Sequence, residues 1–394
     1  MACHDPPSAA LDNALTVGEV LRAGLPAYAR VHRLPPHHWK ALNAMQVCRT
    51  ALLGAHQYVC ARCGCAQVVP HGCGNRHCPS CQGINSRHWL QAQASVLLPI
   101  TYFHEVFTLP HQLNPLIQQN QAAVYNLLFD SVAQTLLRFG RNHLGAELGI
   151  TAVLHTWGQT LVDHYHLHCI VSGGGPVLDG SRWVRSRSDY LFPVRALSQV
   201  FRAKFCEGLQ ALYAGHRLQF HGQLKPLALA ANFQQLIHQA TRQPWVVYSK
   251  RPLAGPEQVL AYLSRYTHRV GLSNRRLLGL DRRAGTVTFD YKDYADGARH
   301  KPMSLPLEEF IRRLRLHLLP PRFVKIRHYG LLANRGRADR LRRVRALLGV
   351  PAPATPLVPQ RTLPKCLHCG WAALILVRVI PPLRRRPPPV IDTS

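Results

Sequence analysis

The amino-acid sequence predicts an α+β fold with a zinc-ribbon-like module in its N-terminal part. Strand-like and amphipathic helical segments follow one another along the 394-residue chain without regular alternation. Six cysteines crowd between Cys60 and Cys81, and the N-terminus lacks the pattern of a secretory signal, so metal binding is favoured over disulfides. A chain of this length is expected to form two or three domains with a sizeable core.

The predicted elements follow from hydrophobic periodicity and from the Gly and Pro residues that end each run. We expect a helical N-terminal segment over residues 1–54 and a zinc-binding domain over 55–90. Beyond these lie predicted helices over 85–98, 112–139, 195–214 and 256–266, strands over 102–109, 150–157, 166–172 and 245–250, and a hairpin over 276–291. After about Pro302 the chain becomes strongly basic and rich in proline, which indicates a short helical appendage and a loosely ordered tail.

Charge and hydrophobicity indicate a globular protein with a polyanionic partner. The chain has 48 Lys and Arg against 19 Asp and Glu, a formal charge of +29, and 47% hydrophobic residues. This composition excludes wholesale disorder. The apolar run from Trp371 to Leu383 contains Arg378 and two prolines and is shorter than the roughly 18–20 residues that span a bilayer, so no membrane partner is expected.

Two Cys-x2-Cys pairs predict a structural zinc site. Cys60 and Cys63 are separated from Cys78 and Cys81 by 14 residues, and four thiolates complete a tetrahedral Zn²⁺ site with no open position. Three further residues of this block remain alternative ligands: Cys65, Cys73 and His77. A Cys366-x2-Cys369 pair lacks a visible second pair, so the sequence leaves metal binding there open.

A His-x-His pair predicts a second metal site with open coordination positions. His166 and His168 are two residues apart in a predicted strand, so both imidazoles leave the same face and can share one ion. His155, at the end of the preceding strand, could supply the third ligand across an antiparallel pair. His164 and Gln159 are the alternatives. By itself the pair is a weak signal, because the chain has 23 histidines.

Two tyrosines lie four residues apart on a predicted helix. Tyr262 and Tyr266 would share one helical face, where aromatic packing is the ordinary explanation. A phenol, with a pKa of about 10, becomes a nucleophile only beside a metal or base. Basic residues near the tyrosines and near the cysteine block are candidate ligands for a DNA backbone: Arg76, Arg87, Lys250, Arg265, Arg269 and Arg275.

In this order, the three motifs resemble those of the HUH transposases (histidine, hydrophobe, histidine) of the two-tyrosine insertion-sequence-91 type. The matching segments are Cys60 to Cys81, His155 to Gly175 and Val247 to Asn274. The resemblance implies an HUH catalytic domain over residues 91–300, with a central antiparallel sheet flanked by helices, and a basic appendage and tail over 301–394. Tyr165 stands where the family pattern has proline, a difference expected to affect how the strand begins more than metal ligation.

The resemblance also implies an activity, cofactors and partners. His166 and His168 would bind Mg²⁺ or Mn²⁺, Tyr262 and Tyr266 would be nucleophiles, and the zinc module would help to bind the DNA ends of the element. The reaction would be rolling-circle-like transposition of single-stranded DNA through a 5′-phosphotyrosine, in the nucleoid-associated cytoplasm of a bacterium. The sequence carries no signal for an oligomeric state.

Other functions fit parts of the same pattern. A non-catalytic zinc-ribbon DNA-binding protein needs only the cysteines and the positive charge. A related replication initiator or relaxase would share the chemistry. A metal-dependent hydrolase would use water as the nucleophile and form no covalent protein–DNA species.

Overall fold

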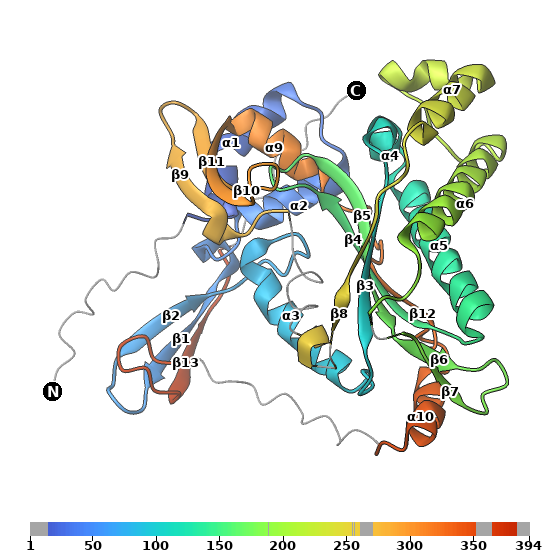
Figure 1. The fold of residues 1–394 in the computed structure, drawn as a ribbon. Helices are drawn as coiled ribbons and strands as arrows, with labels where there is room; N and C mark the ends of the chain where they lie inside the picture. Colours follow the sequence, from blue (N-terminus) through green and yellow to red (C-terminus); the bar gives the residue numbers. More distant parts are fainter. Residues whose placement is uncertain are drawn as a thin grey trace. The chain divides into compact units, whose positions relative to one another are not determined.

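The computed structural model describes residues 15–187, 189–253, 255, 257–260, 271–351 and 365–383, and the chain divides into two compact units (Figure 1). Unit 1 comprises residues 1–85, 272–318 and 357–394. Unit 2 comprises residues 86–271 and 319–356. Each unit is therefore assembled from segments that are distant in the sequence, and the units do not follow the predicted linear boundaries at 54, 90 and 300.

Unit 2 is built on a five-stranded antiparallel sheet, as expected for the catalytic domain. The strand order is β12-β4-β5-β3-β8, so β5 lies in the middle. The strands are β3 (Tyr102–Thr108), β4 (Gly149–Trp157), β5 (Asp163–Ser172), β8 (Val247–Leu253) and β12 (Ile326–Gly330). Four of these strands lie close to predicted ones, whereas β12 comes from the segment predicted to be an appendage.

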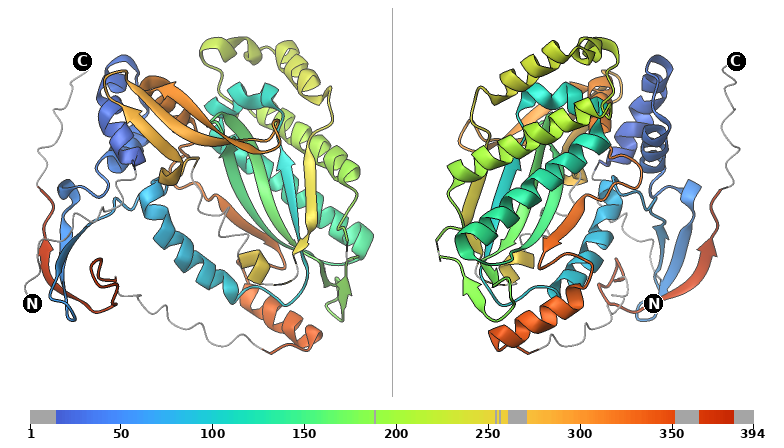
Figure 2. Two further views of the ribbon diagram at one scale, coloured as in Figure 1. Left: turned by 60° about the vertical axis from the view of Figure 1, so that its left-hand side comes forward. Right: turned by 90° about the vertical axis from the view of Figure 1, so that its right-hand side faces the viewer.

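One face of this sheet is covered by two long helices, α5 (Gln121–Phe139) and α6 (Val194–Ala214), as Figure 2 shows. Side chains alternate along a strand, and the helix-facing set, which includes Phe107, Leu154 and Leu167, is fully buried in the main hydrophobic core. Each such side chain contributes roughly 1.5–3 kcal/mol to folding. The opposite face of the sheet therefore carries the alternate residues of the same strands.

Glu105 is a buried carboxyl on the helix-facing side of β3. It lies between Phe103 and Phe107 in the strand and is fully buried. Burial raises its pKa to about 7, although Ser249 Oγ donates a hydrogen bond of 2.8 Å to Oε1. Because it faces the apolar core, Glu105 lies on the other side of the sheet from the histidines described below.

Further helices and short strands of unit 2 lie outside this sheet. They are α4 (Asn114–Gln119), β6 (Gly174–Pro176), β7 (Trp183–Arg185), α7 (Ala230–Thr241) and α10 (Arg337–Leu348). The predicted helix over 112–139 is interrupted at Asn120, whose side chain instead bonds the backbone of Gln219. In α10, Leu341 and Val344 pack on a small apolar cluster that includes Leu331, so this basic helix is docked on the unit.

In its described residues, unit 1 contains two small antiparallel sheets and a group of helices. The helices α1 (Val17–Val31), α2 (Pro36–Gln46) and α9 (Leu307–Leu316) pack together, and α1 and α2 lie within residues 1–54, the segment that the sequence predicts to be helical. A capping box between Thr16 and Glu19 starts α1. The sheets have the orders β11-β10-β9 and β13-β1-β2. Their strands are β1 (Ala55–Cys60), β2 (Ala66–Pro70), β9 (Leu277–Asp281), β10 (Thr286–Asp293), β11 (Arg299–Pro306) and β13 (Leu374–Ile380).

The C-terminal segment differs from the prediction of a loosely ordered tail. Residues 374–380 form β13, which pairs antiparallel with β1, more than 300 residues earlier. The long helix α3 (Pro79–Ala94) follows the cysteine block. The helices that the structure describes were also compared with the requirements of a membrane span. None of them is both long enough and apolar enough to cross a bilayer.

Candidate metal centres

Three histidines of unit 2 meet on the face of the sheet opposite the long helices. His166 and His168 project from β5, and His155 stands directly opposite His166 in the antiparallel β4–β5 pairing. One nitrogen from each of the three rings lies within 4.8 Å of the others. The structure therefore brings together the three ligands that the sequence predicts.

The spacing of these nitrogens suits a single metal ion. His166 Nε2 and His168 Nε2 are 3.1 Å apart, and two nitrogens bound to one ion at about 2.0–2.1 Å lie roughly 3.0–3.4 Å apart. His166 Nδ1 donates a 2.8 Å hydrogen bond to the carbonyl oxygen of His164. A proton on Nδ1 leaves the lone pair on Nε2, the atom that faces the cluster.

Burial keeps the imidazoles of His166 and His168 neutral. His166 and His155 are 8% and 4% exposed. Desolvation lowers the pKa of His166 to about 3 and holds the pKa of His168 well below its usual value. Neutral imidazole is the form that binds a divalent ion, so the donors fit a metal site.

A fourth histidine, His104, supports His168 from the neighbouring strand β3. Its Nε2 lies 2.9 Å from His168 Nδ1, and the two rings are stacked with centroids 5.1 Å apart. A proton on His168 Nδ1, donated to His104, would leave His168 Nε2 free to bind an ion. His104 is not among the site residues predicted from the sequence. Alternation along the predicted strand over 102–109 indicates that His104 and Glu105 lie on opposite faces of the sheet. The sequence does not show which strand pairs with which, so it does not reveal that His104 lies beside His168.

Replacing His104 by glutamine is expected to weaken Mn²⁺ binding about 10- to 100-fold, because His168 loses the partner that orients its ring. Electron paramagnetic resonance titration of the full-length protein with Mn²⁺ would measure this. His328→Gln is the control. His328 is a half-buried histidine of the same sheet, and its Nδ1 lies 3.0 Å from Thr151 Oγ1 rather than on the cluster. Equal losses in both variants would mean that general destabilisation, and not ring orientation, is responsible.

The alternative third ligands lie at the margin of this cluster. His164 is exposed, with its ring centroid 4.7 Å from that of His166, and Gln159 lies in the turn between β4 and β5. By contrast, a ring nitrogen of His155 lies within 4.8 Å of a ring nitrogen of His166 and of His168.

Only some of the predicted DNA-binding and nucleophilic residues lie in the part of the chain that the structure describes. Lys250 on β8 pairs with His104 in the strand register and is exposed, so it lies on the face that bears the histidines. Arg76 is half-buried, Arg275 is exposed, and both belong to unit 1. Four predicted residues lie outside the described residues: Tyr262, Tyr266, Arg265 and Arg269. The side chain of Arg87 is likewise not described.

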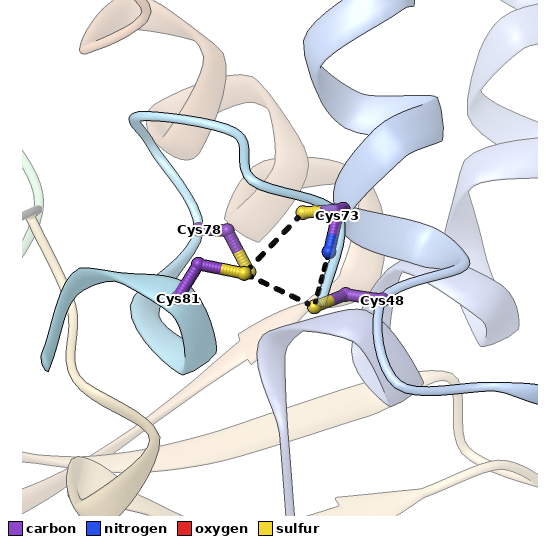
Figure 3. Close-up of side chains that lie close together, drawn as sticks. All are labelled: Cys48, Cys73, Cys78 and Cys81. Atoms are coloured by element: carbon purple, nitrogen blue, oxygen red, sulfur yellow. Dashed lines mark hydrogen bonds between the residues drawn. The ribbon is translucent and has the colours of Figure 1, made fainter. Parts of the chain in front are cut away.

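In unit 1 the predicted cysteine quartet is divided between two clusters. Cys78 and Cys81, at the start of α3, join Cys48 and Cys73 (Figure 3). Cys81 Sγ lies 3.5 Å from Cys48 Sγ and 3.8 Å from Cys73 Sγ. Four sulfurs bound tetrahedrally at about 2.3 Å are roughly 3.8 Å apart, so this cluster fits a four-thiolate zinc site.

Cys60 and Cys63, the other half of the predicted quartet, join Cys366 and Cys369 instead. The Sγ separations are 3.6 Å between Cys60 and Cys369 and 3.7 Å between Cys63 and Cys366. The backbone N–H of Cys63 lowers the pKa of Cys60 to about 6, and the N–H of Cys369 lowers the pKa of Cys366.

The alternative zinc ligands have different surroundings. Cys73, an alternative in the sequence analysis, belongs to the first cluster, whereas the His77 ring lies 3.3 Å from the Asn75 side chain. Cys65 lies beside Cys63 and His368. Cys48 was missed, because a single cysteine 12 residues before the first pair has no spacing signal.

Comparisons with known proteins find similarity to transposases. A family model described as "Putative transposase" matches residues 149–340, and a "Transposase zinc-binding domain" matches residues 20–109. A "Putative transposase y4qJ" of Sinorhizobium fredii (strain NBRC 101917 / NGR234) is 41% identical, over 96% of this chain and 98% of its own length. The "Transposase for insertion sequence element IS801" of Pseudomonas savastanoi pv. phaseolicola is 28% identical, over 75% of this chain and 70% of its own length.

No solved structure matches this chain at the same level of significance. The first relative covers nearly the whole of both chains, and the two family models together include the histidine triad and six of the eight clustered cysteines. Membership of a transposase family argues against a purely DNA-binding role and against a replication initiator or relaxase. The chain belongs to the insertion-sequence-91 family of transposases and carries the zinc-binding domain of that family in its N-terminal part.

Proposed function

We propose that this transposase nicks and rejoins single-stranded DNA through a 5′-phosphotyrosine intermediate, in rolling-circle-like transposition. The observation that carries the proposal is the convergence of His155, His166 and His168 on one face of the sheet. Tyr262 and Tyr266 are the proposed nucleophiles. Both tyrosines lie outside the described residues, so their assignment rests on the sequence pattern.

The histidine triad would hold Mg²⁺ or Mn²⁺. When bound, such an ion would polarise the scissile phosphate and so make the phosphorus a better electrophile. An all-imidazole donor set favours Mn²⁺ more than Mg²⁺, which prefers oxygen ligands. His104 would position His168, and the Lys250 ammonium on the same face would attract the DNA phosphates.

The chemical step is a transesterification: one phosphoester bond forms as another breaks, so the step needs no energy source such as ATP. The phenol oxygen of one tyrosine attacks phosphorus, and a Tyr–O–P bond forms while the bond from phosphorus to the 3′-oxygen breaks. The phenol loses its proton to solvent, and the released 3′-oxygen gains one. Attack by a free 3′-hydroxyl on the phosphotyrosine reverses the step and rejoins DNA. Two tyrosines would allow a second cleavage while the first covalent link persists.

Unit 1 would contribute DNA binding around its zinc-supported fold. The proposed DNA contacts are Arg76 and Arg87, in and just after the cysteine block of the sequence, and Lys250, Arg265, Arg269 and Arg275, which flank the two tyrosines in the sequence. The chain charge of +29 supports a polyanionic substrate. Such an enzyme would work at the nucleoid, where its DNA lies.

The test is covalent capture of DNA labelled at its 3′ end. Full-length protein is incubated with single-stranded DNA from the ends of its own element, with Mg²⁺, Mn²⁺ or a chelator, and analysed by denaturing electrophoresis. A 5′-phosphotyrosine carries the 3′-labelled fragment with the protein, so we expect a metal-dependent labelled adduct that persists in each single Tyr→Phe variant and disappears in Tyr262→Phe/Tyr266→Phe.

Tyr248→Phe is the matched control, because Tyr248 is an exposed tyrosine on β8. It should leave the adduct unchanged. Cleavage without an adduct would indicate a hydrolase that uses water. An adduct that survives in the double variant would refute the nucleophile assignment.

A further inference from the structure

We propose that a second structural zinc ion joins residues 60–63 to residues 366–369, independent of the catalytic proposal above. Its ligands would be the four cysteines of the second cluster: Cys60, Cys63, Cys366 and Cys369. The zinc-binding family model ends at residue 109, so the second half of this site lies outside it.

The sulfur positions fit one tetrahedral ion. The four sulfurs lie within 4.8 Å of one another, with measured pairs at 3.6 and 3.7 Å, against roughly 3.8 Å for two thiolates on one zinc. These separations far exceed the roughly 2.05 Å of a disulfide bond. Four mutually adjacent sulfurs are the arrangement of a four-thiolate zinc site rather than of two disulfides.

The two Cys-x2-Cys pairs form the same turn twice. In each, the second cysteine is followed by glycine, and that glycine donates its N–H to the carbonyl of the first cysteine: Gly64 to Cys60 at 2.9 Å and Gly370 to Cys366 at 2.8 Å. Both glycines have φ of 71°, a left-handed conformation that glycine adopts without strain. Repetition of one backbone geometry in two distant segments indicates two halves of one site.

Hydrogen bonds also repeat at the next position of each turn. Cys60 N–H donates to the carbonyl of Cys65 at 2.9 Å, and Cys366 N–H donates to the carbonyl of Trp371 at 2.8 Å. The β1–β13 pairing places Cys60 opposite Leu374, so the two turns stand at the same end of the strand pair. Two such turns placed together are the framework of a zinc ribbon.

Burial of apolar side chains contributes little to the stability of the β1–β13 pairing. Ile375, Val377 and Val379 are 57%, 52% and 57% exposed. The buried residues of the local apolar cluster are Cys60, Cys366 and Leu374. A strand that buries so little apolar surface needs another source of stability, and coordination by four thiolates supplies one.

The experiment counts thiolate-bound metal in the full-length protein. Zinc is measured by mass spectrometry, and cobalt-substituted protein is measured by its sulfur-to-metal charge-transfer absorption, which an imidazole site does not give. We expect two thiolate-bound ions per chain in the parent and one in Cys366→Ser/Cys369→Ser, with the charge-transfer absorption about halved. Cys206→Ser, at a half-buried cysteine of unit 2 outside both clusters, should retain both ions.

A conservative variant separates ligation from misfolding. Cys369→His keeps a zinc ligand, so it should retain two ions while its cobalt spectrum changes toward a three-sulfur, one-nitrogen site. The proposal is overturned if Cys366→Ser/Cys369→Ser keeps two thiolate-bound ions, if the parent binds only one, or if Cys369→His leaves the cobalt spectrum unchanged. None of these readouts depends on transposition, so a failed catalytic proposal would not affect them.

Discussion

Replacing His166 and His168 together by glutamine is expected to reduce DNA cleavage at least about a thousandfold while the protein remains folded. The two imidazoles supply the nitrogens that are 3.1 Å apart, and without them the proposed ion loses two of its three ligands. Lewis-acid stabilisation of a transition state is worth several kcal/mol, and about 4 kcal/mol corresponds to a thousandfold in rate. The rate of cleavage of labelled single-stranded DNA, with the thermal unfolding temperature alongside, measures both parts of the expectation.

Single variants then test the third ligand. His155→Gln should strongly reduce cleavage at limiting metal, whereas His164→Gln should change the rate by less than about fivefold, because His164 is outside the grouped nitrogens. A double His166/His168 variant that cleaves within tenfold of the parent would place the catalytic metal elsewhere. Greater damage from His164→Gln than from His155→Gln would reverse the ligand assignment.

Replacing Cys48 and Cys81 by serine is expected to remove one zinc ion and unfold the zinc-binding part of unit 1. Zinc-finger peptides gain about 10–16 kcal/mol from structural zinc, which is as large as the roughly 5–15 kcal/mol that stabilises a whole domain. Cys48 follows α2 and Cys81 lies in the first turn of α3, so the ion would link the end of one helix to the start of the other.

Zinc content, and hydrogen exchange resolved along the chain, would measure this effect. Exchange should accelerate over about residues 36–85, while the sheet of unit 2 stays protected, and DNA binding should fall. Cys206→Ser serves again as the control. Unchanged zinc content and exchange in the Cys48/Cys81 variant would show that these cysteines are packed thiols rather than ligands.

Four of the five strands of the unit 2 sheet could be predicted because each carries its own signal. Residues 150–157 and 166–172 are apolar runs ended by turn residues, and they became β4 and the core of β5. The His-x-His spacing fixed that His166 and His168 share a face, since side chains alternate in any strand. The position of His155 followed from the antiparallel pairing of consecutive strands.

Other elements had no local signal that decided their partners. β12 lies in a basic region that resembles a surface segment, and β13 is a short apolar run beside prolines. Each becomes a strand because a distant edge offers hydrogen bonds: Ile326 pairs with Val153, and Leu374 pairs with Cys60. Such pairing depends on the path of the chain between the two strands, and composition and hydrophobic periodicity do not predict that path.

The cysteine sites show the division between sequence and tertiary structure most clearly. By itself, the sequence determined the family of the chain, the Cys-x2-Cys turns as candidate metal ligands and the shared face of His166 and His168, because these depend on residues a few positions apart. Only the tertiary structure decided that Cys60 and Cys63 meet Cys366 and Cys369, and that His104 supports His168. A turn of four residues fixes the direction of its own thiolates, whereas the completion of a tetrahedron depends on contacts across about 300 residues of chain.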